Sequence, residues 1–263
     1  MNWNLAKKVF GDRWRSTTVY GVAIALYVLM LTALYPSVSK MTQFKTAAYP
    51  KDLLRFFGVK SLDISSFNNY MVLQLFSVMW VVILVAFVIA WSRNAIAGEL
   101  EEGTMEFLLS QPVGRARALI TQSVMMLGGM IALVVVTMLS IIVFGTAFSQ
   151  KVSYGGYGAF IPAAVALFAA VAGYSMMFSA WLGDRKAIMA SAGLTLAFYL
   201  LHFGGLYSKP IAKLDYVGIF HYYDPLKVLN KAAFPARDFL VLLLFAVVFF
   251  AAAYLIFRRR DIT

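Results

Sequence analysis

The sequence has 263 residues, of which 62% are hydrophobic and 13% are charged, and its formal net charge is +11. This composition excludes an ordinary soluble domain, in which about half of the residues are apolar. The absence of cysteine from the sequence excludes disulfide bonds, zinc–thiolate sites and thiol catalysis. The basic residues lie mostly between apolar segments and at the chain ends, which favours anionic lipid headgroups over nucleic acid as their partner.

The first predicted element is an amphipathic helix over residues 1–18. Trp3, Phe10 and Trp14 fall on one helical face, and Trp, Lys and Arg side chains favour the membrane interface. We therefore expect an interfacial helix that lies along the membrane surface before the chain turns inward; the alternative is a basic, frayed tail. The apolar run that follows ends without a small-residue cleavage site, so it is predicted to remain as a span and not to be removed as a signal peptide.

Six apolar segments are long enough to cross a bilayer as helices. They are residues 19–35, 71–91, 118–148, 159–182, 187–207 and 239–257. We therefore expect an all-α integral membrane protein with one transmembrane domain over residues 1–263 and with both termini on one side. Three further membrane-interface anchors are predicted directly after the last segment: Arg258, Arg259 and Arg260.

The segments between the predicted spans differ in character. Residues 36–69 form a long polar and aromatic excursion, and residues 150–158 are expected to form a short Gly-rich turn. Residues 208–238 mix prolines with aromatic residues, a pattern typical of broken helices at membrane depth or at the interface. Within the spans, Gly128-Gly129 permits close packing or a kink, and Ala169 and Gly173, four residues apart, predict a flat face for another helix.

A charged segment, residues 92–117, separates the second and third spans. It holds four of the twelve acidic residues of the chain, within a stretch of eight positions. A helix that continues the second span is expected to break at Gly103, and a second, short helix is expected to end at Gln111-Pro112. The segment is therefore predicted to be a water-facing connector between two spans.

The short helix of this connector carries an apolar stripe. Met105, Leu108 and Leu109 are spaced i, i+3 and i+4, and Glu106 near the helix start suits the positive end of the helix dipole. A stripe this small cannot cover a core of its own, so the helix needs a partner. The alternative is an ordinary solvated loop whose acids keep it out of the bilayer.

A resemblance favours the first interpretation. The string GELEEGTMEFLLSQPVGR resembles the hallmark of type-2 ATP-binding-cassette (ABC) exporter permeases, and the closing FRRRDI is similar to the usual end of that family. The resemblance implies that residues 99–112 form a cytoplasmic coupling helix that docks on a separate ATPase. The residues implied to make this contact are Glu99, Glu102, Gly103, Thr104, Met105, Glu106, Leu108, Leu109 and Pro112.

The resemblance also implies an assembly. Two permease copies, identical or related, are expected to work with two ABC ATPase subunits, which bind ATP and Mg while this chain carries no cofactor. The location implied is the cell (plasma or inner) membrane, with both termini cytoplasmic. The uncharged span faces favour a hydrophobic or amphipathic substrate, although core packing uses the same residue types.

The sequence offers little chemistry of its own. The six apolar segments contain no Asp, Glu, Lys or Arg, so no carboxylate is available at the midplane to relay protons or to bind a coupling ion. No phosphate-binding loop of the G-x-x-x-x-G-K-[ST] type occurs, so ATP hydrolysis is expected on the partner chain and no catalytic or metal-binding residue is assigned.

Two positions leave alternatives open. His202 lies alone in the fifth span, where a hydrogen bond to a neighbouring carbonyl is the more common role of a histidine. His221 and Asp224 share a helical face and are open to interpretation as metal ligands or as an acid–base pair, but an aromatic interfacial anchor is favoured. Rival functions are a membrane-embedded lipid-modifying enzyme and a scaffold subunit that transports nothing.

Because the sequence contains no cysteine, single cysteines report the topology cleanly. Lys45→Cys and Gly103→Cys are expected to react with a membrane-impermeant thiol reagent from opposite sides of the membrane, since one spacer is predicted outside and the other in the cytoplasm. The unsubstituted chain is the control and should remain unlabelled. Labelling of both positions from the same side would contradict the arrangement in six spans.

Overall fold

The computed structural model describes residues 3–43, 66–97 and 115–259. In these ranges the ordered elements are helices, and no strand is present among them. The prediction of an all-helical fold is therefore confirmed for the described residues. The predicted coupling helix, residues 99–112, lies in the gap between the second and third ranges, whereas residues 92–97 and 115–117 at the two ends of the predicted connector are described. We use the name coupling segment for residues 98–114, and its flanks are the described ends.

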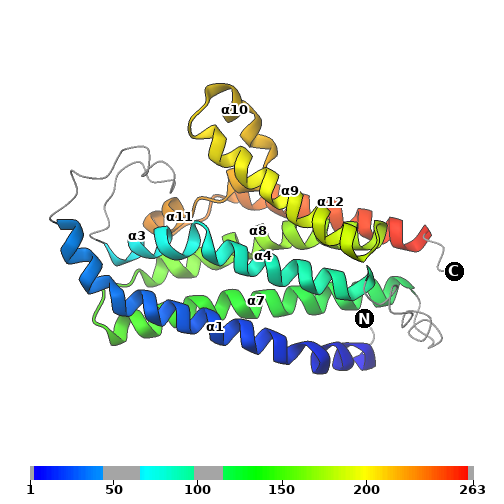
Figure 1. Ribbon diagram of the computed structural model, residues 1–263, viewed down its shortest axis with the longest axis horizontal. Coiled ribbons are helices and arrows are strands. Elements are labelled where there is room, and N and C mark those ends of the chain that lie inside the picture. Colours follow the sequence, from blue (N-terminus) through cyan, green and yellow to red (C-terminus); the bar gives the residue numbers. More distant parts are fainter. Residues whose placement is uncertain (1–2, 44–65, 98–114, 260–263) are drawn as a thin grey trace.

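Five of the described helices are long and apolar enough to cross a membrane. They are α1 (Trp3–Gln43), α7 (Arg115–Ala147), α8 (Tyr154–Trp181), α9 (Asp184–Gly205) and α12 (Ala236–Arg259). A bent pair of helices adds a sixth crossing if the pair spans the membrane as one unit. The start of α1 and the end of α12 lie at the same end of the bundle as the start of α7 (Figure 1).

The first span differs from the prediction. We expected an interfacial helix over residues 1–18 followed by a turn, but α1 runs without interruption from Trp3 to Gln43. No proline precedes Pro36, and the hydroxyls of Thr17 and Thr18 donate to carbonyls four residues earlier, at 3.1 and 2.9 Å, so nothing breaks the helix here. The orientation of its first turns toward a membrane surface stays a prediction.

The second span is broken, which the sequence analysis did not predict. It consists of α3 (Phe67–Met71) and the π-helical η1 (Val72–Phe76), and then of α4 (Met79–Ser92) and the π-helical η2 (Arg93–Ala97). The two halves meet at Ser77 and Val78 with a bend of 42°. At this bend the backbone N–H and the hydroxyl of Ser77 both donate to the carbonyl of Val72, at 2.9 and 2.8 Å.

The helix α8 is the centre of the bundle. In its most apolar stretch 72% of the residues are buried, against 17% for α9 and for α12. It also begins earlier than expected, because the predicted Gly-rich turn over residues 150–158 ends at Ser153. The hydroxyl of Ser153 accepts a hydrogen bond from the N–H of Gly156 and caps the helix. The capping serine thus outweighs the low helix propensity of the three glycines that follow.

The predicted flat face of α8 is used by α12. A Cβ atom added to Gly173 would lie 3.0 Å from the carbonyl oxygen of Ala246 and 3.1 Å from the Cβ atom of Phe249. The close approach of these two helices therefore depends on the missing side chain. Gly129 of α7 plays a similar part, since its Cα faces the rings of Trp91 and Phe87, and α7 continues past it as one helix.

Broken helices follow α9, as the mixture of prolines and aromatic residues predicted. They are α10 (Lys209–Leu214), the 3₁₀ turns η3 (Asp215–Val217) and η4 (Ile219–Tyr222), and α11 (Pro225–Lys231). The segment folds back against the bundle beside the C-terminal half of α9, with α10 at its tip (Figure 1). The buried side chain of Tyr223 contacts Phe160 of α8 and donates to the carbonyl of Phe76 in the bent span, and the buried ring of Phe220 packs against Tyr199 of α9.

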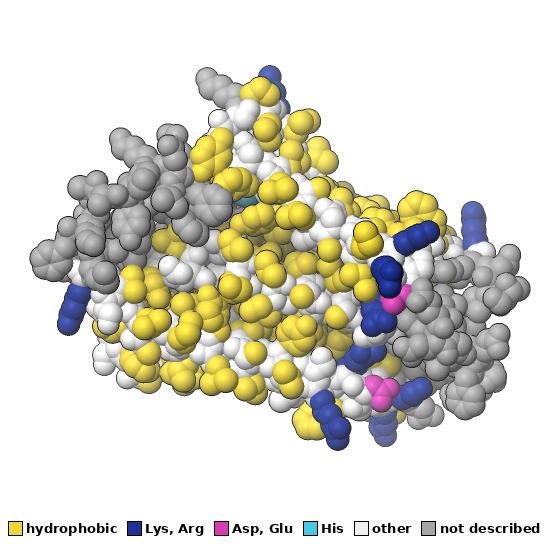
Figure 2. All heavy atoms as spheres, viewed as in Figure 1, with side chains coloured by type: hydrophobic (Ala, Val, Ile, Leu, Met, Phe, Trp, Pro, Cys, Tyr) yellow, Lys and Arg dark blue, Asp and Glu magenta, His cyan; other side chains and the backbone are white. Residues whose placement is uncertain are grey.

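The surface of the bundle is consistent with a bilayer. Hydrophobic side chains cover the middle of the face seen in Figure 2, and most of the lysine and arginine side chains in this view gather toward one end. Large apolar residues of α1 are exposed on this surface, among them Val19, Leu26 and Met30. Exposed apolar surface of this extent is stable in lipid and not in water.

The contact between α8 and α12 yields a stability prediction. Gly173→Leu should lower the melting temperature of the purified chain in detergent, because the added side chain meets the backbone of Ala246; overpacking of this kind costs about 1 to 3 kcal/mol. Gly193→Leu is the matched control, since nothing lies within 4 Å of a Cβ atom at that position on α9. Equal melting temperatures for the two variants would show that α12 does not pack on α8 in this way.

Candidate functional site

The residues predicted to contact an ATPase lie outside the described residues. This holds for Glu99, Glu102, Gly103, Thr104, Met105, Glu106, Leu108, Leu109 and Pro112. The structure does describe the two flanks of the segment, which are η2 on one side and the start of α7 on the other. These flanks show what the coupling segment is attached to.

The leading flank carries an ion pair to another part of the bundle. Nε and Nη2 of Arg93 donate to the two carboxylate oxygens of Asp184, at 2.5 and 2.8 Å. Such a two-point pair between a guanidinium and a carboxylate fixes orientation as well as distance. Asp184 is also the first residue of α9, where the helix dipole favours a negative charge. The ion pair thus joins the end of the bent span to the turn between α8 and α9.

Hydrogen bonds next to this ion pair fix the same flank. The hydroxyl of Ser179, on α8, donates to the carbonyl of Ser92 at 2.7 Å, and the hydroxyl of Ser92 donates to the sulfur of Met126, on α7, at 3.2 Å. Both serines are buried. The last turn of α4 is therefore bonded to two other helices just before the coupling segment begins.

The trailing flank is the start of α7 and packs on another helix of the bundle. After the coupling segment, α7 packs mainly along α1, and Ala118 and Leu119 are buried in its first turns. The hydroxyl of Thr121 donates to the carbonyl of Arg117 at 2.7 Å, which adds a bond within this part of the helix. The leading flank is therefore bonded to α7, α8 and α9, and the trailing flank, which is the start of α7 itself, packs mainly along α1.

The predicted interface anchors are exposed where the structure describes them. Trp3, Phe10 and Trp14 are 64%, 61% and 49% exposed, and the ammonium of Lys7 lies 5.7 Å from the centre of the Trp3 ring. Arg258 and Arg259 are exposed in the last turn of α12, and Arg260 lies beyond the described residues. The start of α1 and the end of α12 lie at the same end of the bundle as the start of α7 (Figure 1).

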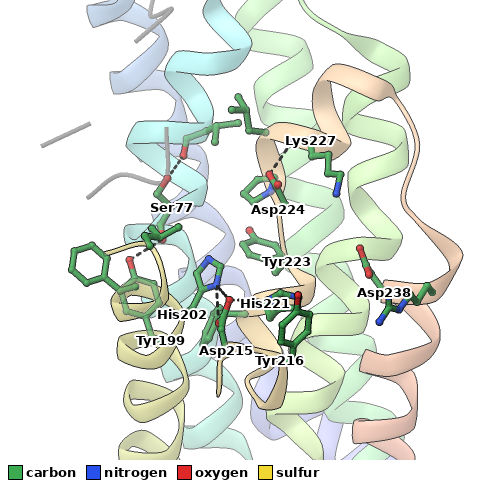
Figure 3. A pocket seen from close by; sticks show the side chains of 17 residues that line it. Ser77, Tyr199, His202, Asp215, Tyr216, His221, Tyr223, Asp224, Lys227 and Asp238 are labelled. Carbon is green, nitrogen blue, oxygen red and sulfur yellow. Dashed lines mark hydrogen bonds and ion pairs between the residues drawn. The ribbon is translucent and has the colours of Figure 1, made fainter. Parts of the chain in front are cut away.

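A polar cluster that the sequence analysis missed lies where α9 meets the broken helices. Nδ1 of His202 lies 3.1 and 3.2 Å from the two carboxylate oxygens of Asp215, and Nδ1 of His221 lies 2.7 Å from one of them. The three residues come from the last turn of α9, from η3 and from η4, and Asp215 is buried. Figure 3 shows His202, Asp215 and His221 gathered at a cavity of about 510 Å³.

This cluster corrects the two open interpretations of these histidines. His202 is not alone, and His221 does not pair with Asp224, whose carboxylate instead accepts the N–H of Lys227 at 3.0 Å and caps α11. No periodicity in the sequence predicts that His221 pairs with Asp215, since the two residues are six positions apart across two 3₁₀ turns. Only the fold-back of this segment onto α9 brings the two histidines to one carboxylate.

The cavity also borders the break in the second span. The hydroxyl of Tyr223 donates to the carbonyl of Phe76, and that of Tyr199 donates to the carbonyl of Ser77, both at 3.4 Å. Burial raises the pKa of the Tyr223 hydroxyl well above its ordinary value, so this group keeps its proton and remains a donor. Tyrosines from two other elements thus satisfy carbonyls that the bend leaves without helical partners.

The described residues offer no metal site of three or more His, Asp or Glu ligands. In the cluster, the carboxylate oxygens of Asp215 already have hydrogen-bonding partners, which are the Nδ1 atoms of His202 and His221. The arrangement is suited to holding two elements together and to presenting the two rings to the cavity.

Comparison with known proteins identifies one family. The family described as "ABC-2 family transporter protein" matches residues 3–262 of the chain, which is nearly its whole length. None of the curated proteins compared with the sequence matches it.

Proposed function

The chain belongs to the ABC-2 transporter family of membrane proteins, and from this premise we propose that it is the permease subunit of an ATP-driven exporter. In this proposal two permease copies, identical or related, form the path for a hydrophobic or amphipathic substrate. Two separate ABC ATPase subunits bind ATP and Mg and supply the energy. The chain itself is not an enzyme, in keeping with a sequence that contains no phosphate-binding loop.

The observation that carries the coupling part of this proposal is the ion pair between Arg93 and Asp184. A segment that transmits force must be attached to the elements that it moves. The two-point contact and the bond from Ser179 to the carbonyl of Ser92 attach the leading flank to the turn between α8 and α9. A displacement of the coupling segment is therefore passed to two spans, and not to the end of one helix alone.

The trailing flank passes the same displacement to α7 and α1. Because α7 packs mainly along α1, a movement of the coupling segment also acts on that second pair of helices. Closure of two ATPases around ATP would pull the coupling segments of two permease copies together. We propose that this tilts one pair of helices against the other and opens a path between the two copies.

The coupling helix itself is proposed to dock through its apolar stripe. Met105, Leu108 and Leu109 would each contribute about 1 to 2 kcal/mol when buried in a groove of the ATPase. Glu102 and Glu106 would pair with basic residues around that groove and would set register more than strength. The coupling residues of the predicted segment thus divide into an apolar set for affinity and an acidic set for alignment.

The stripe can be tested by a single substitution. Leu108→Asp should leave the chain inserted in the membrane but abolish its association with the ATPase, because a charge replaces a buried leucine. The measurement is copurification of an ATPase of about 25 to 35 kDa with the tagged chain. Glu106→Ala is the matched comparison and should retain assembly while it reduces coupling. Normal copurification with Leu108→Asp would show that this helix is a solvated loop.

The ion pair can be tested separately from docking. Arg93→Met should leave the ATPase bound but uncouple it, so that the ATP hydrolysis of the reconstituted complex no longer responds to the permease. A partly exposed ion pair contributes only about 1 kcal/mol to stability, so the fold should survive. The control is Arg185→Met, which removes an exposed neighbouring charge and should change little.

Exchange of the two charges completes this test. The double variant Arg93→Asp/Asp184→Arg should recover part of the coupling that Arg93→Met loses, since the pair can form again in the opposite sense. If Arg93→Met and Arg185→Met behave alike in the hydrolysis assay, the ion pair does not transmit force.

A further inference from the structure

The cavity beside Asp215 has an unusual inventory of hydrogen-bonding groups. A carboxylate only accepts hydrogen bonds, so the nitrogen of each histidine that faces Asp215, Nδ1, carries the proton. In a neutral imidazole this leaves Nε2 as an acceptor. No described residue provides a hydrogen bond to Nε2 of either ring, and both histidines line the cavity (Figure 3). With both rings neutral, the cluster presents two acceptor nitrogens beside a buried carboxylate.

Apart from Tyr216, which is exposed, the lining residues with hydroxyl groups already use their hydrogens within the protein. The hydroxyl of Ser77 donates to the carbonyl of Val72, and the hydroxyls of Tyr199 and Tyr223 donate to the carbonyls of the broken span. The lining cations, Lys227 and Arg237, have exposed side chains and belong to the rim. The interior therefore offers acceptors and negative charge, and a matching ligand must bring hydrogen-bond donors and positive charge.

The remaining walls are aromatic and apolar. Phe203, Leu206 and Phe220 line the cavity together with the rings of Tyr199 and Tyr216. Faces of aromatic rings attract cations, and an apolar wall holds the uncharged part of a ligand. The ring of His221 is itself held between Tyr216 and Tyr222, with ring centres 4.2 and 5.0 Å away, so the acceptor has a fixed orientation.

We propose that this cavity is a binding site for the ammonium group of an amphipathic amine. The N–H groups of the ligand donate to Nε2 of His202 and of His221, the charge of Asp215 acts through the two rings, and the apolar part lies against the aromatic wall. A divalent cation fits less well, since the described residues supply no set of three ligands. An anion would be repelled by Asp215 and would find no inner donor.

The rim carries charges of both signs and does not alter this assignment. Asp224 and Asp238 lie there with Lys227 and Arg237, so the rim has no net charge of its own. The positive ligand is selected by the buried carboxylate, which no lining cation neutralises. The proposal concerns binding by this chain alone and needs no ATP, so its outcome is independent of the coupling function proposed above.

Three probes of one shape and different charge test the proposal: tryptamine, which is a cation, tryptophol, which is neutral, and indole-3-acetate, which is an anion. The full-length chain in nanodiscs of zwitterionic lipid is studied by equilibrium dialysis, with empty nanodiscs subtracted. Tryptamine should bind saturably and at least about tenfold more tightly than either analogue, a difference of about 1.4 kcal/mol. Equal binding of tryptamine and tryptophol, or preferred binding of indole-3-acetate, would overturn the proposal.

Variants locate the binding in this cavity. Asp215→Asn should weaken tryptamine binding about tenfold or more, because it removes the charge at nearly constant size, whereas Asp12→Asn, an exposed carboxylate near the start of α1, should leave binding unchanged. His221→Phe keeps a ring between the two tyrosines but removes both nitrogens, and it should weaken binding several-fold. Size-exclusion profiles and melting curves report folding. A folded Asp215→Asn or His221→Phe variant with unchanged affinity would refute the site.

Discussion

The constraint on which this structure depends is that backbone N–H and C=O groups in an apolar environment must find partners within the protein. Continuous helices satisfy it for α1, α7, α8, α9 and α12. The bent second span does not satisfy it, because its series of helical backbone hydrogen bonds is interrupted at Ser77 and Val78. Tyr199 and Tyr223 supply donors there from elsewhere in the chain. The bend is therefore stabilised by α9, through Tyr199, and by the segment that follows α9, through Tyr223.

The same constraint acts on side chains in the core. The indole N–H of Trp80 donates to the hydroxyl of Thr137 at 2.9 Å, and that hydroxyl donates in turn to a carbonyl of its own helix. Tyr174, at the centre of α8, shares a hydrogen bond of 2.5 Å with Thr195 of α9. Each of these pairs joins two spans that follow one another in the chain. Polar groups inside the bundle thus specify which helices are neighbours, while apolar contacts such as that at Gly173 set their spacing.

The helix α9 joins the two regions that carry the functional proposals. Its first residue, Asp184, pairs with Arg93 at the flank of the predicted coupling segment, and His202 in its last turn contacts Asp215 of the folded-back segment. A helix of 22 residues is a rigid element, so a displacement at one end reaches the other. In this member of the ABC-2 transporter family, α9 therefore connects the cavity beside His202 with the ion pair proposed to take part in coupling to an ATPase.

What the sequence by itself determined was the class of protein. Apolar length and the spacing of charges are local properties, so they predicted an all-helical membrane protein. The string GELEEGTMEFLLSQPVGR carried the resemblance to the family, and the mixture of prolines and aromatic residues predicted the broken helices after α9. Other features depend on neighbours distant in sequence. Neither the bend at Ser77, nor the pairing of Arg93 with Asp184, nor the placement of two histidines on Asp215 follows from any local pattern. The tertiary structure decided these, because each requires groups separated by 6 to 147 residues to meet.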